Sequence, residues 1–143
     1  NLIANHVVIA GDDPFATVRV ADADRRRGCE LQAKSHLIHL REGFLETQGN
    51  PKHVGRLIAS SAPAFRTLLT NLARLEIDDE SDRGLDTTAL ASTIERIIGV
   101  PAPLTAEILA STGMSTIADP TALLARYIDA SERIWRYVDG WRE

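Results

Sequence analysis

The histidines are the residues whose type and spacing bear most directly on chemistry. His36 and His39 lie three residues apart in a stretch with helical periodicity, and this spacing can bring two imidazoles to one metal ion. A metal site needs a third ligand, and Glu46 lies about two helical turns beyond His39, with no pattern that brings it close. We therefore predict that His36 and His39 share a solvated or hydrogen-bonded polar face, opposite the apolar rows of the helix, and hold no metal.

Neither the cysteine nor the serines form a recognisable nucleophile. Cys29 falls on an apolar row, which favours a small buried side chain over a thiol activated by the nearby arginines. No serine lies in a G-x-S-x-G turn, and the sequence contains no phosphate-binding glycine loop. The sequence therefore predicts no catalytic residue in this chain.

Three consecutive arginines, Arg25, Arg26 and Arg27, form the one concentrated basic feature. At the start of a helix they oppose the helix dipole, and Asp22 and Asp24 are expected to offset them. Two interpretations stay open. The run is either an exposed charged first turn or a contact for a phosphate group or a partner.

Composition sets limits on the class of protein. The 143 residues are 44% hydrophobic and 25% charged, as expected for one globular domain. The net charge of −4 argues against nonspecific binding of nucleic acid, and no apolar run approaches the length of a membrane span. A single cysteine excludes an internal disulfide and is typical of a reducing compartment. We therefore expect a cytoplasmic protein with no membrane partner.

The N-terminal segment has a different pattern from the rest. Residues 6–10 (HVVIA) predict a short strand that ends at Gly11, and no second strand follows to pair with it. An unpaired strand leaves its backbone groups without partners. We therefore expect residues 1–18 to be an extended arm or strand left from a preceding domain, and residues 19–143 to form a helical domain.

From Asp22 onward the periodicity is helical. We predict helices over 22–48, 51–75, 87–98, 105–111 and 120–138, with a kink or restart at Pro63 and an exposed acidic loop over 76–86. The fold class is therefore all-α, an antiparallel up-and-down helical bundle of about five helices. The first helix carries two apolar rows and should pack on two sides; the rows are Cys29, Ala33, Leu37, Leu40 and Phe44, and then Leu31, Ile38 and Leu45.

The last helix ends in an aromatic cluster of Trp135, Tyr137 and Trp141 beside Arg142. Such residues are enriched at interfaces between chains, and they pack equally well inside a bundle. Both interpretations stay open at this stage.

The run from Arg25 to Gly49, RRRGCELQAKSHLIHLREGFLETQG, and the later SSAPAFRTLL at 60–69 carry a family resemblance. They resemble the helical domain that follows a nucleotidyltransferase-fold catalytic domain in many bacterial proteins. The similarity covers roughly residues 6–75, and the rest of the chain matches only in being helical. The architecture is akin to the C-terminal halves of aminoglycoside nucleotidyltransferases and to HEPN domains.

This resemblance implies an accessory domain without catalytic residues. Mg²⁺ and a nucleoside triphosphate would belong to the missing N-terminal domain, so no cofactor is expected in this chain. The Gly-Ser turn of the catalytic motif is absent here, and no histidine follows an arginine at the separation found in ribonuclease-active HEPN domains. Transfer chemistry and RNA cleavage are therefore not expected of these residues.

In such proteins the helical domain closes one wall of the substrate cleft, and this implies a binding role. The polar face of the first helix is then the predicted surface for a substrate or a partner, made of Lys34, His36, His39, Arg41 and Glu42. Two alternatives stay open: a self-contained interaction domain that forms a homodimer through the opening strand or the C-terminal helix, and a helical bundle that binds a small ligand in an apolar pocket.

Overall fold

The computed structural model describes residues 21–77 and 85–142, together with Val7, Ile9 and Gly11. The described part is all-α, as predicted. Its elements are α1 (Asp22–Thr47), α2 (Pro51–Ile77), α3 (Thr87–Ile98), α4 (Ala102–Ala110), α5 (Pro120–Asp139) and a short 3-10 helix η1 (Gly140–Arg142). None of the helices among these residues combines the length and the apolar content that crossing a membrane requires.

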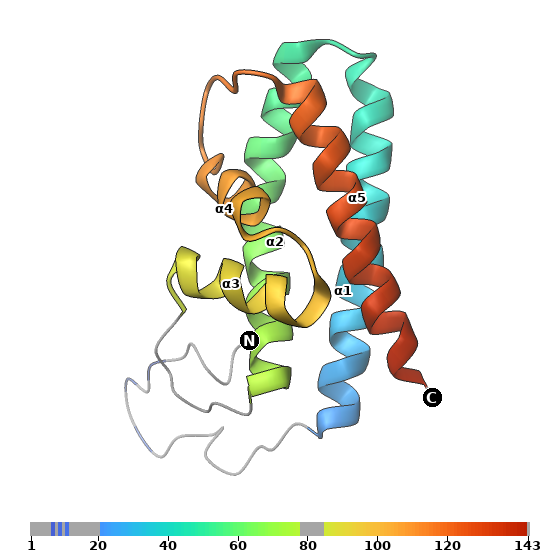
Figure 1. Cartoon of the computed structure of the whole chain (residues 1–143), viewed down its shortest axis with the longest axis vertical. Helices are drawn as coiled ribbons and strands as arrows, with labels where there is room; N and C mark the ends of the chain where they lie inside the picture. The colour runs from blue at the N-terminus through green and yellow to red at the C-terminus, as the bar shows by residue number, and fades with distance from the viewer. Residues whose placement is uncertain (1–6, 8, 10, 12–20, 78–84, 143) are drawn as a thin grey trace.

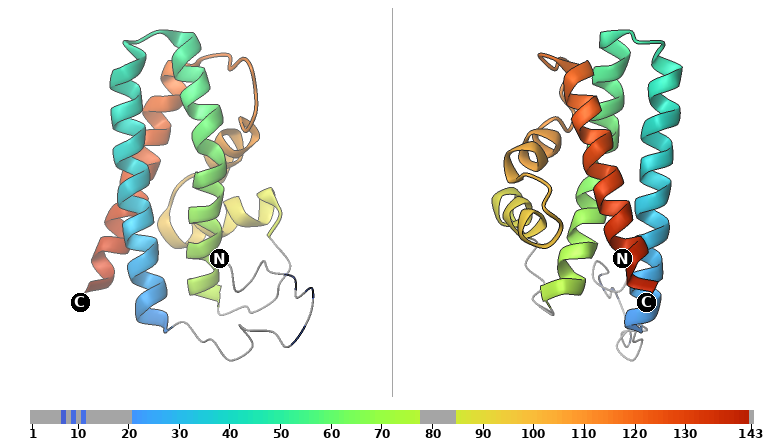
Figure 2. Two further views of the ribbon diagram at one scale, coloured as in Figure 1. Left: turned by 180° about the vertical axis from the view of Figure 1, so that it is seen from behind. Right: turned by 45° about the vertical axis from the view of Figure 1, so that its right-hand side comes forward.

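Three long helices, α1, α2 and α5, run along the long axis of the bundle (Figure 1). Helix α1 runs in the opposite direction to α2 and α5, which both run toward the end of the bundle where the C-terminus lies. The two short helices α3 and α4 pack beside α2 and α5 (Figure 2). They connect the end of α2 to the start of α5 at the opposite end of the bundle. The long helices therefore do not simply alternate in direction along the chain.

Helix ends agree with the capping residues that the sequence offers. Asp86 accepts a hydrogen bond from the amide of Ala89 at 2.8 Å, and Asp119 accepts one from the amide of Ala122 at 3.1 Å. Helix α4 begins at Ala102, three residues before the predicted start, and includes Pro103. Proline fits there because the first turn of a helix leaves its amide groups without intrahelical partners.

Pro63 lies inside α2, which continues unbroken on both sides. Of the kink or restart predicted at this position, the restart is absent. The residues around the proline are anchored, since Ala62 and Phe65 are fully buried. Their packing in the core offsets the loss of one backbone hydrogen bond, so the tertiary structure outweighs the local preference of proline.

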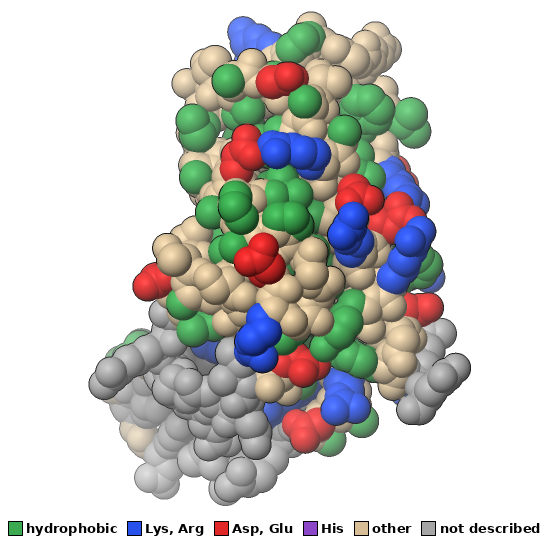
Figure 3. Space-filling model, viewed as in Figure 1, with side chains coloured by type: hydrophobic (Ala, Val, Ile, Leu, Met, Phe, Trp, Pro, Cys, Tyr) green, Lys and Arg blue, Asp and Glu red, His purple; other side chains and the backbone are tan. Residues whose placement is uncertain are grey.

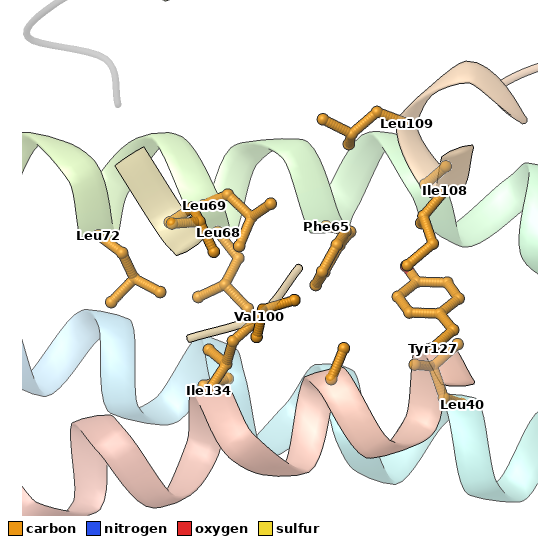
Figure 4. Close-up of a cluster of buried hydrophobic side chains, with 14 of the residues drawn as sticks. Leu40, Phe65, Leu68, Leu69, Leu72, Val100, Ile108, Leu109, Tyr127 and Ile134 are labelled. Carbon is orange, nitrogen blue, oxygen red and sulfur yellow. The ribbon is translucent and has the colours of Figure 1, made fainter. Parts of the chain in front are cut away.

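The core lies between the three long helices and the short pair. Leu40 of α1, Phe65 of α2, Ile108 of α4 and Tyr127 of α5 meet there, all of them fully buried (Figure 4). Side chains from every helix of the described part therefore contribute to one hydrophobic core.

Several sequence predictions concern segments that lie outside the described residues. Of the strand predicted over 6–10, only Val7 and Ile9 are described, and both are exposed. Residues 12–20, which include the predicted domain boundary, and residues 78–84 of the acidic loop lie outside the described part.

Candidate functional site

Helix α1 separates the five residues predicted to form one polar face. Lys34, His39, Arg41 and Glu42 are exposed, whereas His36 is only 7% exposed. The prediction that His36 lies on the polar face is therefore wrong. His36 follows Ala33 by three positions and precedes Leu40 by four, so it belongs to the buried row of α1.

His36 lies in an aromatic cluster between three helices. Its Nε2 atom is 2.9 Å from the hydroxyl oxygen of Tyr127, and its ring stacks on Phe65 with centroids 5.4 Å apart. Phe65 and Tyr127 meet edge to face at 4.8 Å. Burial, together with the charge of His39, lowers the pKa of His36 to about 4. At neutral pH His36 is therefore an uncharged core residue that joins α1 to α2 and α5.

Because one histidine is buried and the other exposed, His36 and His39 do not converge on one ion. His39 instead lies 3.8 Å from the carboxylate of Glu42, in a pair open to solvent on both sides. Among the residues that the structure describes, no group of three His, Cys, Asp or Glu side chains is placed to hold a metal. The geometry of α1 thus gives no support to the two-histidine arrangement.

Arg41 connects α1 to α5. Its guanidinium donates to the Glu132 carboxylate at 2.9 Å, and Glu132 also accepts from Arg136. Pairs this exposed contribute little to stability, because water and salt screen them. These pairs show how α1 is oriented, because they place the side of α1 that carries Arg41 next to α5.

The second apolar row of α1 is exposed in the part of the chain that the structure describes. Leu31 is 63% exposed, Ile38 43% and Leu45 75%. The sequence predicted that both apolar rows of this helix would pack. The structure buries Cys29, Ala33, Leu37 and Leu40 of the first row, whereas Phe44 at its end is 39% exposed. An apolar row beside Lys34, Arg41 and Glu42 is therefore the most prominent surface feature of α1.

The three arginines at the start of α1 are all exposed, and they point to different neighbours. Arg25 pairs with Asp22 at 3.8 Å, while Arg26 lies over the Trp141 ring at 5.8 Å from its centroid. Arg26 thus joins the start of α1 to the C-terminal end of the bundle by a cation–π contact. Arg27 lies on the exposed side of the helix.

The C-terminal aromatic residues also pack within the chain. Tyr137 donates a hydrogen bond to Glu76 of α2 at 2.7 Å, and its ring meets Trp141 edge to face at 5.5 Å. Burial, followed by the bond to Glu76 and its charge, raises the pKa of Tyr137 to about 12. Trp135, Tyr137 and Trp141 are partly buried against the core, which fits the packing interpretation of this cluster.

A shallow surface hollow lies along α5. Acidic and basic side chains lie next to one another on the face of the molecule that Figure 3 shows. The hollow was not predicted, because its residues come from two helices that are distant in sequence. Its charged groups already pair with one another, so they do not converge on an empty centre. The lining residues are Ile98, Asp129, Glu132, Arg133, Arg136 and Tyr137.

Cys29 is buried on the first apolar row, as its spacing predicted. Its side chain is 4% exposed, and burial raises the pKa of the thiol to about 11. The nearby arginines do not counter this effect, because their charged groups lie in solvent. The thiol is therefore protonated at neutral pH and unsuited to nucleophilic attack.

The chain matches no known protein family, and neither a characterised protein nor a solved structure is significantly similar to it. The candidate site therefore rests on the geometry of α1 alone.

Proposed function

We propose that this chain is a non-catalytic helical accessory domain of a nucleotidyltransferase-like protein, and that it binds a substrate or a partner through the outer face of α1. The single observation that carries the binding role is the exposed row of Leu31, Ile38 and Leu45 beside charged side chains. The link to nucleotidyltransferases comes from the sequence resemblance over residues 6–75. In this proposal Mg²⁺ and the nucleoside triphosphate belong to a preceding catalytic domain.

The distribution of reactive groups supports a role in binding. Cys29 and His36, a thiol and an imidazole that could take part in covalent or acid-base chemistry, lie in the core. The exposed groups of α1 are long charged side chains, aliphatic side chains and the imidazole of His39 beside Glu42. Such groups are suited to contacts with another molecule. An accessory domain of this kind orients a substrate without taking part in bond making. The single buried thiol also fits the cytoplasmic location that we propose.

Thermal unfolding in the presence of ligands tests whether α1 binds a substrate. We expect a small polyamine to raise the melting temperature in a concentration-dependent way, because a ligand that binds only the native state stabilises it. Glu42→Ala should reduce this shift, since it removes an exposed carboxylate of α1 that can pair with the cation. Glu107→Ala is the matched control, because Glu107 is an exposed carboxylate of α4 that pairs with Arg126. An unchanged shift in Glu42→Ala would contradict the assignment of α1 as the binding face.

A second function, a self-contained interaction domain, is favoured by the same exposed row. Apolar side chains at this spacing are more typical of a helix that packs against another helix than of a site for a small polar ligand. In that case α1 binds a protein partner rather than a substrate, and association is the property to measure.

A further inference from the structure

Leu31, Ile38 and Leu45 form a narrow apolar line along α1, called here the α1 ridge. The three residues are seven positions apart, and all are substantially exposed. Residues at this interval drift by only about 20° around a straight helix. The ridge therefore extends along most of α1, and its spacing is that of helices that pair side by side.

The two flanks of the α1 ridge carry different charges. Lys34 and Arg41 follow a ridge residue by three positions, whereas Ser35 and Glu42 follow one by four. Positions three and four residues on lie on opposite sides of a helical row. One flank is therefore basic, and the contact of Arg41 with Glu132 places it toward α5. The other flank carries Ser35 and Glu42.

The position of α1 leaves this surface accessible within the described part of the chain. Contacts from α2 and α5 reach α1 from its inner side, through Gln32 with Asn71 and Arg41 with Glu132. Between these contacts the ridge faces outward. The side chains of Arg41 and Glu42 are 53% and 66% exposed, so both can still reach a neighbouring molecule.

We propose that the α1 ridge packs against the α1 ridge of a second copy of this chain, with the two helices parallel about a twofold axis. This inference rests on the proposed partner-binding role of α1 and names the partner. In a parallel pair the basic flank of one helix faces the acidic flank of the other. Arg41 then lies within about 1.5 Å, the rise of one residue, of the height of the partner's Glu42.

The opposite orientation is disfavoured by charge. In an antiparallel pair each flank faces its own equivalent. If the two ridges are centred on Ile38, Lys34 then lies level with the partner's Arg41, and like charges meet twice. The flanks are thus complementary to a second copy only when the helices run in the same direction. One patch that complements itself is what a twofold interface requires.

The interface formed in this way is small. One helix face covers less than the roughly 800 Å² per partner of a standard stable complex. We therefore expect a dimer that dissociates on dilution, and the intramolecular bond of Arg41 to Glu132 is retained in it.

Sedimentation velocity over a range of protein concentrations tests the association. The mass should rise from the 15.6 kDa of one chain toward twice that value. Ile38→Asp should abolish the rise, while Ala125→Asp, at an exposed position of α5, should leave it unchanged. Circular dichroism establishes that both variants are folded. A single-chain mass at every concentration would overturn the proposal.

Cysteine cross-linking tests the orientation. In a parallel pair, Leu31→Cys forms a disulfide with its own copy, and so does Leu45→Cys, under mild oxidation. Ala125→Cys is the control, and the native Cys29 is buried. Cross-linking only in a mixture of the two ridge variants would show an antiparallel pair and overturn the parallel arrangement. Disulfide-linked dimers equally abundant in the Ala125→Cys control would also overturn it, because they would show that cross-linking does not depend on the ridge.

A charge reversal supplies an independent readout. Glu42→Lys should weaken association several-fold, because it places a cation opposite the partner's Arg41. Lys34→Glu should have little effect, since Lys34 faces the partner's Ser35. An increase in affinity with Lys34→Glu would indicate the antiparallel pair. The chain could instead stay monomeric and still show a ligand-dependent rise in melting temperature. That result would exclude a second copy as the partner of α1 and leave the proposed binding of a substrate in place.

Discussion

The Nε2 atom of His36 lies 2.9 Å from the hydroxyl oxygen of Tyr127, and this bond joins α1 to α5 across 91 positions of sequence. Both side chains are buried, so neither can exchange its partner for bulk water. A buried polar group that loses its partner keeps the cost of desolvation without compensation. The pair is therefore a point where a small chemical change should have a measurable effect on stability.

Tyr127→Phe tests this directly. The substitution preserves the ring that packs on Phe65, and it removes only the hydroxyl group. We expect the free energy of unfolding to fall by about 1–3 kcal/mol, because a ring nitrogen of His36 is left unpaired in the core. Urea unfolding followed by circular dichroism measures this change.

Tyr137→Phe is the matched control. It also removes one tyrosine hydroxyl from α5, but the partner that is left, Glu76, is exposed and can bind water instead. The loss of stability should stay below about 1 kcal/mol. Equal losses in the two variants would show that burial of the His36 bond is energetically unimportant.

The pKa of His36 predicts a dependence of stability on pH. The ordinary value of 6.5 is lowered to about 4 in the folded chain, with burial as the main cause. The unfolded chain then binds a proton in a range where the folded chain does not. The contribution of neutral His36 is therefore complete above about pH 6.5, and it is lost as the pH falls toward 4.

Measured unfolding free energies at several pH values, compared between the wild type and His36→Gln, isolate this contribution. Carboxylates titrate in both proteins and cancel in the difference. The wild type should lose more stability than the variant, on the order of 3 kcal/mol between pH 6.5 and 4, since one pKa unit corresponds to about 1.4 kcal/mol. Parallel pH profiles for the two proteins would contradict the lowered pKa.

The fold was largely predictable from the sequence because its signals are local. Asp86 and Asp119 mark the starts of α3 and α5, and Gly99 ends α3 with a positive φ of 78°. Pro63 shows where local reasoning fails, because anchoring by its buried neighbours outweighs the preference of proline. That anchoring depends on other helices and has no signal within α2.

The candidate site was less predictable, since it depends on which face of α1 turns inward. Two apolar rows gave no means to decide which one the chain would cover. His36 fits the steps of three and four that connect Ala33 with Leu40, and this signal could have placed it in the core. Its partner Tyr127 had no such signal, because only the packing of α5 against α1 brings the two together.

Two glycines of α1 predict different effects of the same substitution. A Cβ atom at Gly28 would meet no atom within 4 Å, whereas one at Gly43 would lie 2.6 Å from Cδ1 of Leu57 in α2. Alanine in a helix interior is favoured over glycine by about 0.8–1.0 kcal/mol. We expect Gly28→Ala to gain roughly this amount in free energy of unfolding, and Gly43→Ala to lose the gain because Leu57 must move.

Thermal unfolding of Gly43→Ala in the wild type and in a Leu57→Ala background checks the cause. Shortening Leu57 removes the conflict, so Gly43→Ala should become stabilising in that background. This double-mutant comparison attributes the coupling to one contact. Additive effects of the two substitutions would show that α1 and α2 are not in close contact at this point.

The buried thiol of Cys29 predicts protection from alkylating and disulfide reagents. Its pKa is raised from the ordinary 9.0 to about 11, which lowers the thiolate fraction at neutral pH by roughly a hundredfold. Burial at 4% exposure also blocks the approach of a reagent. In native buffer, labelling of Cys29 should therefore be limited by unfolding, and its rate should rise with added urea.

A Ser35→Cys variant, exposed on the same helix, should label its new thiol at an ordinary rate under native conditions. Rapid native labelling of Cys29 would show that the first apolar row of α1 is open to solvent, and the inward face of α1 would then have to be reassigned.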